Sequence, residues 1–211
     1  MEKAAWIGLT MALGLSACAS TRECDQKIAD LEQQLREKDN EVHRLRTDEA
    51  NIAEMSNANR TLSKKLQDEI AKGQLTVSQL RNRLTISVIE EVLFSSGSVD
   101  LHADGKGILD RVADVLKSID SRLIMVEGHT DDVAIGPKLV ERYPTNWELS
   151  TARAATVVRY LQSRGVAPKH LGAAGFSEYR SLAPNDSAAN RQRNRRIDVV
   201  LTPEIQEKTP D

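Results

Sequence analysis

The sequence predicts an α/β layer fold that follows a long helical segment. Between about Thr85 and Pro203, apolar runs of strand length alternate with amphipathic runs of helix length, a pattern typical of helices packed on a sheet. From Asp25 to about Leu84 the chain contains no proline and no aromatic residue and is rich in charged and amide side chains. Aromatic residues are only 3% of the whole chain, which indicates that part of it lies outside a globular core.

The elements of the α/β part can be placed in order from periodicity and turn residues. Gly165 with Pro168 just beyond it predicts the end of the second helix. We expect strands at Ile86 to Phe94, Arg122 to Gly128, His170 to Phe176 and Arg196 to Leu201, and helices at Ala103 to Ser118, Asn146 to Arg164 and Ser187 to Asn194. The polar tail, residues 204–211, is expected to be flexible.

The helical segment, residues 25–84, has the apolar spacing of a coiled coil. Its first run has gaps of three, four and seven, interrupted by Lys38 and Glu49. A second run follows a polar patch at residues 56–59 in a different register. A coiled-coil spacer that forms a homo-oligomer is expected, and a solvated linker is the alternative. The first run is Ile28, Leu31, Leu35, Val42, Leu45 and Ile52, and the second is Leu62, Leu66, Ile70, Val77, Leu80 and Leu84.

The first residues have the features of an export signal, residues 1–17. A short charged start precedes an apolar run from Ala4 to Leu15, which is shorter than the about 20 residues that cross a bilayer. The sequence Leu15-Ser16-Ala17-Cys18 resembles the lipobox of bacterial lipoproteins. That resemblance implies cleavage before Cys18 and its lipidation, with residues 18–24 linking the anchor to the helix. An ordinary signal peptide is the alternative. Ala19, in place of aspartate, implies the outer membrane and a periplasm-facing chain.

Cys24 is then the second of only two cysteines. In an oxidising compartment, a leftover cysteine suggests an intermolecular disulfide or a free thiol. Both alternatives stay open at this point.

A candidate ligand site lies between the second expected strand and the second expected helix. Asp131 follows a strand end, and Arg153 lies two turns into the helix that begins at Asn146. An aspartate and an arginine could hold a small zwitterion, the first taking its ammonium and the second its carboxylate. A structural salt bridge between the two is the alternative. Asn146, seven residues before Arg153, could contact the ligand from the same helix face or cap the helix.

The residues give little support for nucleic-acid binding, metal binding or catalysis. The net charge of −2 gives no electrostatic case for nucleic acid, so Arg191 and Arg193 are interpreted as surface charge. The four histidines are scattered without cysteine partners, so we expect no metal site, and His129 is interpreted as a hydrogen-bonded turn residue. No nucleophile with its base is recognisable. The sequence therefore predicts no enzyme and no cofactor.

Four motifs in order resemble the OmpA-like C-terminal domain, a family that includes Pal and the periplasmic part of MotB. The resemblance covers about Thr85 to Leu201. It implies a layered βαβ domain with a mixed sheet, occupying residues 85–203, that binds peptidoglycan through diaminopimelate of the stem peptide. It also implies that Thr130, Asp131, Asn146, Arg153, Asn194 and Arg195 lie at that pocket. The motifs are Phe94-Ser95-Ser96-Gly97-Ser98, Gly128-His129-Thr130-Asp131, Asn146 to Ala154 (NWELSTARA) and Asn194-Arg195-Arg196-Ile197.

The long loop from Asp132 to Thr145 resembles the MotB branch of the family. A motor protein needs an ionisable residue in a membrane helix, and Ala4 to Leu15 holds none, so we reject that role. The sequence predicts a non-enzymatic tether between the outer membrane and the wall. The alternatives are an envelope scaffold that recruits partners through the coiled coil and a peptidoglycan-remodelling enzyme.

Overall fold

The computed structural model describes residues 3–95, 98–119 and 122–203. Side chains are described at Thr21 and from Glu23 onward within those ranges. The predicted signal peptide, the lipidation of Cys18 and the predicted tail therefore concern residues outside those whose side chains are described. Among the described residues, no helix combines the length and the apolar character needed to cross a membrane.

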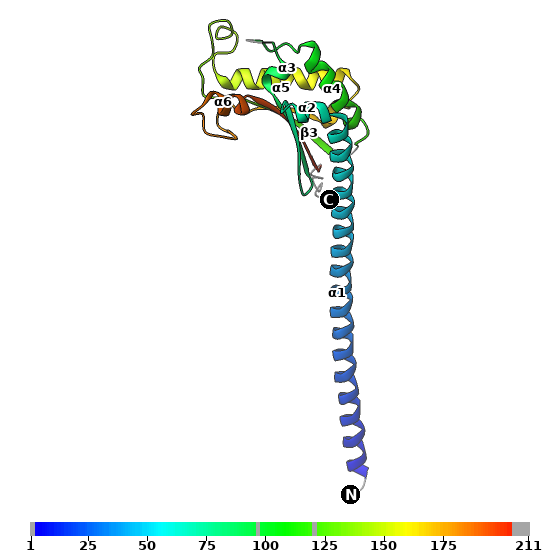
Figure 1. The fold of residues 1–211 in the computed structure, drawn as a ribbon. Helices are drawn as coiled ribbons and strands as arrows, with labels where there is room; N and C mark the ends of the chain where they lie inside the picture. The colour runs from blue at the N-terminus through cyan, green and yellow to red at the C-terminus, as the bar shows by residue number, and fades with distance from the viewer. Residues whose placement is uncertain (1–2, 96–97, 120–121, 204–211) are drawn as a thin grey trace. The chain divides into compact units, whose positions relative to one another are not determined.

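Twelve elements follow one another along the described chain (Figure 1). The helices are α1 (Lys3–Lys65), α2 (Gln67–Ala71), α3 (Glu90–Leu93), α4 (Ala103–Leu116), α5 (Asn146–Ser163), the 3-10 turn η1 (Pro168–His170) and α6 (Ala188–Asn194). The strands are β1 (Leu75–Leu80), β2 (Arg83–Ile89), β3 (Arg122–His129), β4 (Leu171–Gly175) and β5 (Arg196–Pro203). The chain divides into two compact units, residues 1–50 and residues 51–211.

The second unit is built on a five-stranded mixed sheet with the order β1-β2-β5-β3-β4. Strands β1, β2, β5 and β3 pair antiparallel in that order, whereas β3 and β4 are parallel. In the central pair, Gly128 of β3 lies opposite Ile197 of β5, and His129 lies opposite Arg196. The predicted α/β layer fold with a mixed sheet is confirmed.

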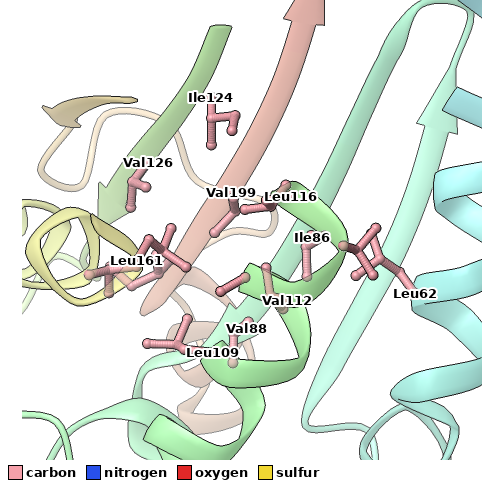
Figure 2. Close-up of a cluster of buried hydrophobic side chains, with 14 of the residues drawn as sticks. Leu62, Ile86, Val88, Leu109, Val112, Leu116, Ile124, Val126, Leu161 and Val199 are labelled. Atoms are coloured by element: carbon pink, nitrogen blue, oxygen red, sulfur yellow. The ribbon is translucent and has the colours of Figure 1, made fainter. Parts of the chain in front are cut away.

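The core lies between the sheet and the helices that cover one face of it (Figure 2). Alternate residues of the central strands point into this layer, as the two-residue period of a strand requires. Helix α4 contributes its apolar stripe, and α5 contributes three further buried positions. The labelled members are Leu62, Ile86, Val88, Leu109, Val112, Leu116, Ile124, Val126, Leu161 and Val199.

The end of helix α1 belongs to this core. Met55, Ala58 and Leu62 are all at most 6% exposed, and their spacing of three and four residues forms one helix face. Leu66, directly after the helix, is fully buried as well. At the same end, the guanidinium group of Arg122, 2% exposed, lies 2.6 Å from the Glu54 carboxylate. The second unit therefore includes the last turns of the long helix.

The prediction that the spacer continues to Leu84 is wrong, and so is the domain start at Thr85. The helical stretch ends at Ala71, Gly73 adopts a φ of +68°, and β1 and β2 form an antiparallel hairpin. Val77 was assigned to the helical seam, but the strand alternates buried or half-buried with exposed residues. Pairing with β2 decides this segment, because strand formation depends on the neighbouring strand more than on local preference.

The expected strand from Ile86 to Phe94 is also corrected. Strand β2 ends at Ile89, and the short helix α3 turns Glu90 and Glu91 toward the ligand-site region. The remaining expectations are confirmed to within a few residues, since α4 and α5 begin at the predicted Ala103 and Asn146.

Replacing Leu62 with alanine tests whether the end of α1 is part of the domain. We expect the free energy of unfolding to fall by about 2–5 kcal/mol, because a fully buried leucine leaves a cavity in a close-packed core. Urea unfolding followed by circular dichroism measures this. The matched control is Thr61→Ala, one residue earlier on the exposed side of the helix, which should change stability by less than about 0.5 kcal/mol. Equal effects of the two changes would contradict the assignment.

Candidate ligand-binding site

The site forms where the end of β3 meets the first turn of α5. Helix α5 lies so close to the sheet here that a Cβ atom at Gly128 would lie 2.1 Å from the carbonyl oxygen of Ser150. A Cβ atom at Gly175, on the parallel neighbour β4, would lie 2.2 Å from the Thr151 hydroxyl oxygen. Glycine at both positions lets the helix approach the strand ends. Residues that follow β3 are thereby brought beside residues on α5.

The first turn of α5 is fixed by a capping box. The Thr145 hydroxyl accepts from the backbone N–H of Trp147, and the Glu148 carboxylate accepts from the backbone N–H of Thr145. Thr145, not Asn146, is therefore the N-cap. The Asn146 amide is left to donate to the carbonyl groups of Asp131 and Val133, each at 3.2 Å. This pair of bonds ties the helix to the loop after β3.

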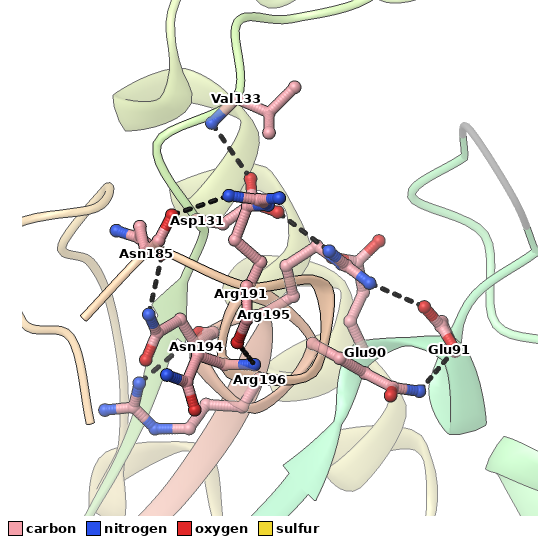
Figure 3. A network of polar contacts seen from close by, with 12 residues as sticks. Glu90, Glu91, Asp131, Val133, Asn185, Arg191, Asn194, Arg195 and Arg196 are labelled. Carbon is pink, nitrogen blue, oxygen red and sulfur yellow. Dashed lines mark hydrogen bonds and ion pairs between the residues drawn. The ribbon is translucent and has the colours of Figure 1, made fainter. Parts of the chain in front are cut away.

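Asp131 is 5% exposed and both of its carboxylate oxygens are engaged (Figure 3). One oxygen accepts from the backbone N–H of Val133 at 3.1 Å, and the other accepts from Nη1 of Arg195 at 2.7 Å. A carboxylate offers about four lone-pair positions, so it keeps acceptor capacity for a ligand.

Arg153 is 5% exposed and is paired with Glu90, with 2.6 Å between Nη2 and Oε1. Its guanidinium also donates to the carbonyl oxygen of Ser98 at 3.2 Å. Asp131 and Arg153 therefore have different ion-pair partners. The alternative of a direct structural salt bridge between them does not apply in this structure.

The charges of these groups are linked. Burial raises the pKa of the Glu90 carboxyl, although Arg153 and Arg195 both oppose that shift. Burial also lowers the pKa of the Arg153 guanidinium, against the attraction of Glu90. Burial acts in the same direction on Arg195, but hydrogen bonds to Asp131 and Glu91 outweigh it and raise the pKa of Arg195. Two carboxylates and two guanidinium groups thus balance one another inside the site.

These side chains line one open pocket of about 270 Å³. Five of the six predicted ligand-site residues line it or lie at its wall, namely Thr130, Asp131, Asn146, Arg153 and Arg195. The Thr130 hydroxyl is buried and has no hydrogen-bond partner among the described residues. Oε2 of Glu90, also at the pocket wall, accepts no hydrogen bond from them either and lies 3.9 Å from Nε of Arg195.

Asn194 is placed elsewhere, which corrects the prediction for this residue. It is fully buried, and its amide oxygen accepts from the backbone N–H groups of Leu182 and Ala183. Its amide nitrogen donates to the carbonyl oxygen of Ala183 at 2.8 Å. Asn194 therefore fixes the end of α6 against the loop before it, and so holds the adjacent Arg195 in place. Of its neighbours, Arg193 is exposed as expected, whereas Arg191 is half-buried and donates to the Asn185 carbonyl group.

Sequence reasoning missed Glu90 and Glu91. Both were assigned to the middle of an apolar strand, and Glu90 proves to be the partner of Arg153, while Glu91 lies 2.7 Å from Arg195. The available signal was the pair of adjacent carboxylates inside an otherwise apolar run, because a charge in such a position needs a partner.

A separate cluster on the other side of the sheet contains Glu127, His129 and Asp198, whose ligand atoms lie within 4.8 Å of one another. His129 is buried at the end of β3, with Nε2 3.3 Å from the Asp198 carboxylate, so it is a strand residue and not a turn residue. Three guanidinium groups within 4 Å already neutralise the two carboxylates, which disfavours adding a divalent cation. They belong to Arg83, Arg180 and Arg196.

Comparison with known proteins agrees with this geometry. The model of the OmpA family matches residues 93–195. The chain carries an OmpA-family domain.

Solved structures match a larger share of the chain than the family model does. A MotB-like protein from Desulfovibrio vulgaris is 29% identical, with a TM-score of 0.68, and covers 77% of this chain and 99% of its own. The cell wall anchor of the T6SS from Pseudomonas aeruginosa is 31% identical, with a TM-score of 0.62. The match covers 68% of this chain and 97% of the anchor chain. The OmpA family and the fold expected from the sequence motifs are thus confirmed.

Among curated proteins, the peptidoglycan-binding protein ArfA of Mycobacterium bovis is 32% identical over 110 residues, which are 52% of this chain and 32% of ArfA. The chain spans a little over half the length of three other curated relatives, two from Bacillus subtilis and one from Bordetella avium.

Replacing Arg153 with alanine tests the buried ion pair. At pH 7 we expect a loss of about 3–5 kcal/mol in the free energy of unfolding, because the Glu90 charge stays buried without its partner. Without Arg153, the pKa of Glu90 rises further, so the folded state of the variant binds a proton that the unfolded state releases. Stability relative to wild type should therefore recover as pH falls through that raised pKa.

Urea unfolding of both proteins at several pH values between 7 and 5 measures the effect. Adding Glu90→Gln to the Arg153→Ala chain is the control, because it removes the unpaired charge and should restore part of the stability at pH 7. A deficit in the single variant that is independent of pH and unaffected by Glu90→Gln would contradict the assigned pair.

Proposed function

We propose that the domain binds peptidoglycan without cleaving it, through the free zwitterionic end of diaminopimelate in the stem peptide. The observation that carries this proposal is the meeting of Asp131, Arg153 and Arg195 at one small open pocket. Asp131 accepts from the ligand ammonium, and the two guanidinium groups take the ligand carboxylate.

The charge balance of the pocket favours such a ligand. Glu90 and Asp131 offset Arg153 and Arg195. A ligand with one positive and one negative group can exchange contacts with both signs and leave the balance unchanged. A purely anionic or cationic ligand would leave one buried charge without compensation, which is costly.

The remaining groups of the pocket suit recognition of a small polar end. The unpaired Thr130 hydroxyl can donate to the ligand carboxylate or accept from its ammonium. Leu139 and Leu149 supply apolar wall for the aliphatic part of the ligand. The volume of about 270 Å³ is at the small end of ligand pockets, which fits one side-chain end.

Binding is favoured over hydrolysis by the chemistry of the lining. Thr130 carries the hydroxyl at this pocket, and neither histidine nor cysteine is among the lining residues, while the Glu90 and Asp131 carboxylates are already engaged by arginines. The lining thus offers no histidine-activated or cysteine nucleophile. The similarity to a cell wall anchor and to a peptidoglycan-binding protein supports the same proposal.

In the whole protein, we propose that this domain is one end of a tether. Lipid on Cys18 would hold the N-terminus in the outer membrane with the chain facing the periplasm, and helix α1 would form an oligomeric spacer. The second candidate is an envelope scaffold that recruits partners through the spacer, and the exposed apolar residues of α1 are the observation that favours it.

Replacing Asp131 with asparagine tests the ligand contact. We expect the affinity of the full chain for an alanyl-glutamyl-diaminopimelate peptide to fall at least about tenfold, since a charge-assisted hydrogen bond becomes a neutral one. Isothermal titration calorimetry gives the affinity. Asp132→Asn, the exposed neighbour, is the matched control and should bind as wild type does.

A peptide with lysine in place of diaminopimelate lacks only the carboxylate of the zwitterion. It should bind the wild-type chain at least about tenfold more weakly, because the arginines lose their partner. Equal affinity for both peptides, or equal effects of the substitutions at residues 131 and 132, would show that the pocket does not recognise the zwitterionic end of diaminopimelate.

Replacing Cys18 with serine tests the anchor. The substituted chain should lose incorporation of labelled palmitate and leave the outer-membrane fraction of the cell, because several acyl chains are needed for durable attachment. Cys24→Ser is the control that keeps the lipidation position. Palmitate incorporation that depended on Cys24, or outer-membrane retention without Cys18, would refute the proposed anchor.

A further inference from the structure

Helix α1 exposes a continuous apolar seam in the first unit of the chain. Five large apolar side chains, between 44% and 63% exposed, recur at intervals of three, four and seven residues, so they lie on one face of the helix. Burying such a row against a partner is the usual use of this pattern. The five are Ile28, Leu31, Leu35, Val42 and Leu45.

The structure also shows where the seam ends. The second apolar run of the sequence is not available to a partner, since Leu62 and Leu66 are fully buried in the core of the domain and Val77 lies in a strand. The exposed seam therefore has a single heptad register of about four heptads up to Ile52. No stutter in the seam is required, because the run that was out of register belongs to the domain.

The seam residues fit the two-stranded class of coiled coil. Ile28, Leu35 and Val42 occupy one position of the heptad, called a, and Leu31 and Leu45 occupy the other core position, called d. β-Branched residues at a with leucine at d favour two strands. Of the three apolar residues at a, two are β-branched.

We propose that a second copy of this chain covers the seam, forming a parallel, in-register, two-stranded coiled coil over residues 24–52. This deepens the oligomeric spacer of the proposed function by fixing its stoichiometry and direction. The parallel direction also places two lipid-bearing N-termini at the same membrane, so it agrees with the proposed anchor.

The charges that flank the seam support this register. In a parallel pair, a residue at position g faces the residue five places later, at position e, on the other helix. Lys27 then faces Glu32 of the second copy, and Glu41 faces Arg46 of the second copy. Each pair occurs twice by symmetry. The interface thus gains four attractive contacts beside its apolar core.

Lys38 is a polar residue within the row of d positions. Its ammonium lies 2.7 Å from the Glu41 carboxylate of the same helix, so its charge is held at the edge of the seam. Glu49 is a second charged residue in the seam, at an a position. Polar core positions cost stability but restrict the alternative registers and oligomer states. In the proposed dimer, the Glu41 carboxylate would contact both Lys38 of its own helix and Arg46 of the second copy.

Cys24 falls at a d position, one heptad before Leu31, and its thiol is free and exposed. In the parallel, in-register pair the two Cys24 thiols face each other. In an antiparallel pair over residues 24–52 they would lie about 42 Å apart, at 1.5 Å per residue. The cysteine therefore reports the direction of the helices.

The test uses the full chain in detergent with Cys18→Ser, which leaves Cys24 as its one cysteine. Diamide oxidises two thiols to a disulfide and takes up their two electrons and two protons. We expect a disulfide-linked dimer on a non-reducing gel and a dimer by sedimentation equilibrium under reducing conditions. Adding Leu31→Asp and Leu45→Asp should lower the cross-linked fraction at least about tenfold, because charged groups would enter the buried layers.

Gln33→Asp with Thr47→Asp is the matched control, since it adds the same charge on the outer face of the same helix and should leave cross-linking unchanged. Lys27→Glu should weaken the dimer, and adding Glu32→Lys should restore it by rebuilding the pair in reverse. A monomer, a trimer, a dimer that diamide does not link, or equal cross-linking with both aspartate pairs would overturn the proposal.

The same variants separate this inference from the proposed function. A chain with Leu31→Asp and Leu45→Asp keeps the whole pocket and should bind the diaminopimelate peptide with unchanged affinity. Loss of peptide binding in the unsubstituted chain would refute the ligand while leaving the dimer result standing.

Discussion

The close contact between α5 and the ends of β3 and β4 is the constraint on which the site depends. No side chain fits at Gly128 or Gly175, so the first turns of α5 lie directly against the sheet. Asn146 can then bond the loop after β3, and Arg153, two turns further on, reaches the same pocket. A methyl group at either glycine would require a backbone shift, because protein interiors do not compress. The site is consequently set by backbone packing before any charge is considered.

The pocket charges that this packing brings together are already paired. Arg153 is held by Glu90, and Arg195 by Asp131 and Glu91, so the side chains are oriented without a ligand. Such preorganisation lowers the entropic cost of binding. It also limits the gain in free energy, because the ligand exchanges contacts that exist and does not supply missing ones. A single pocket of this kind is suited to modest, reversible affinity.

The sequence predicted those parts of the fold that local pattern decides. The amphipathic stripes of α4 and α5 and the Gly165–Pro168 stop place both helices correctly. Strand β1 was missed because its pairing with β2 overrides a weak helical period. Asp131 and Arg153 were found from motifs, but their partners were not, since Arg195 lies 64 residues from Asp131 and Glu90 was hidden in an apolar run. Asn194 shares a motif with Arg195, yet burial gives it a structural role.

A dimer formed through the apolar seam would carry two pockets, and two pockets that bind together can offset a modest affinity at each one. Peptidoglycan repeats its stem peptide, so two domains carried on one spacer could bind two stem peptides of the same polymer. Once the first domain is bound, binding of the second is intramolecular, and the effective concentration of stem peptide that it meets is raised. The end of α1 packs within its own domain through Met55 and Leu62, which leaves the seam up to Ile52 for a partner. In the proposed tether, dividing one helix between a core and an interface lets each function keep its own residues: the charged pocket would bind the wall, and the seam would determine how many pockets act together.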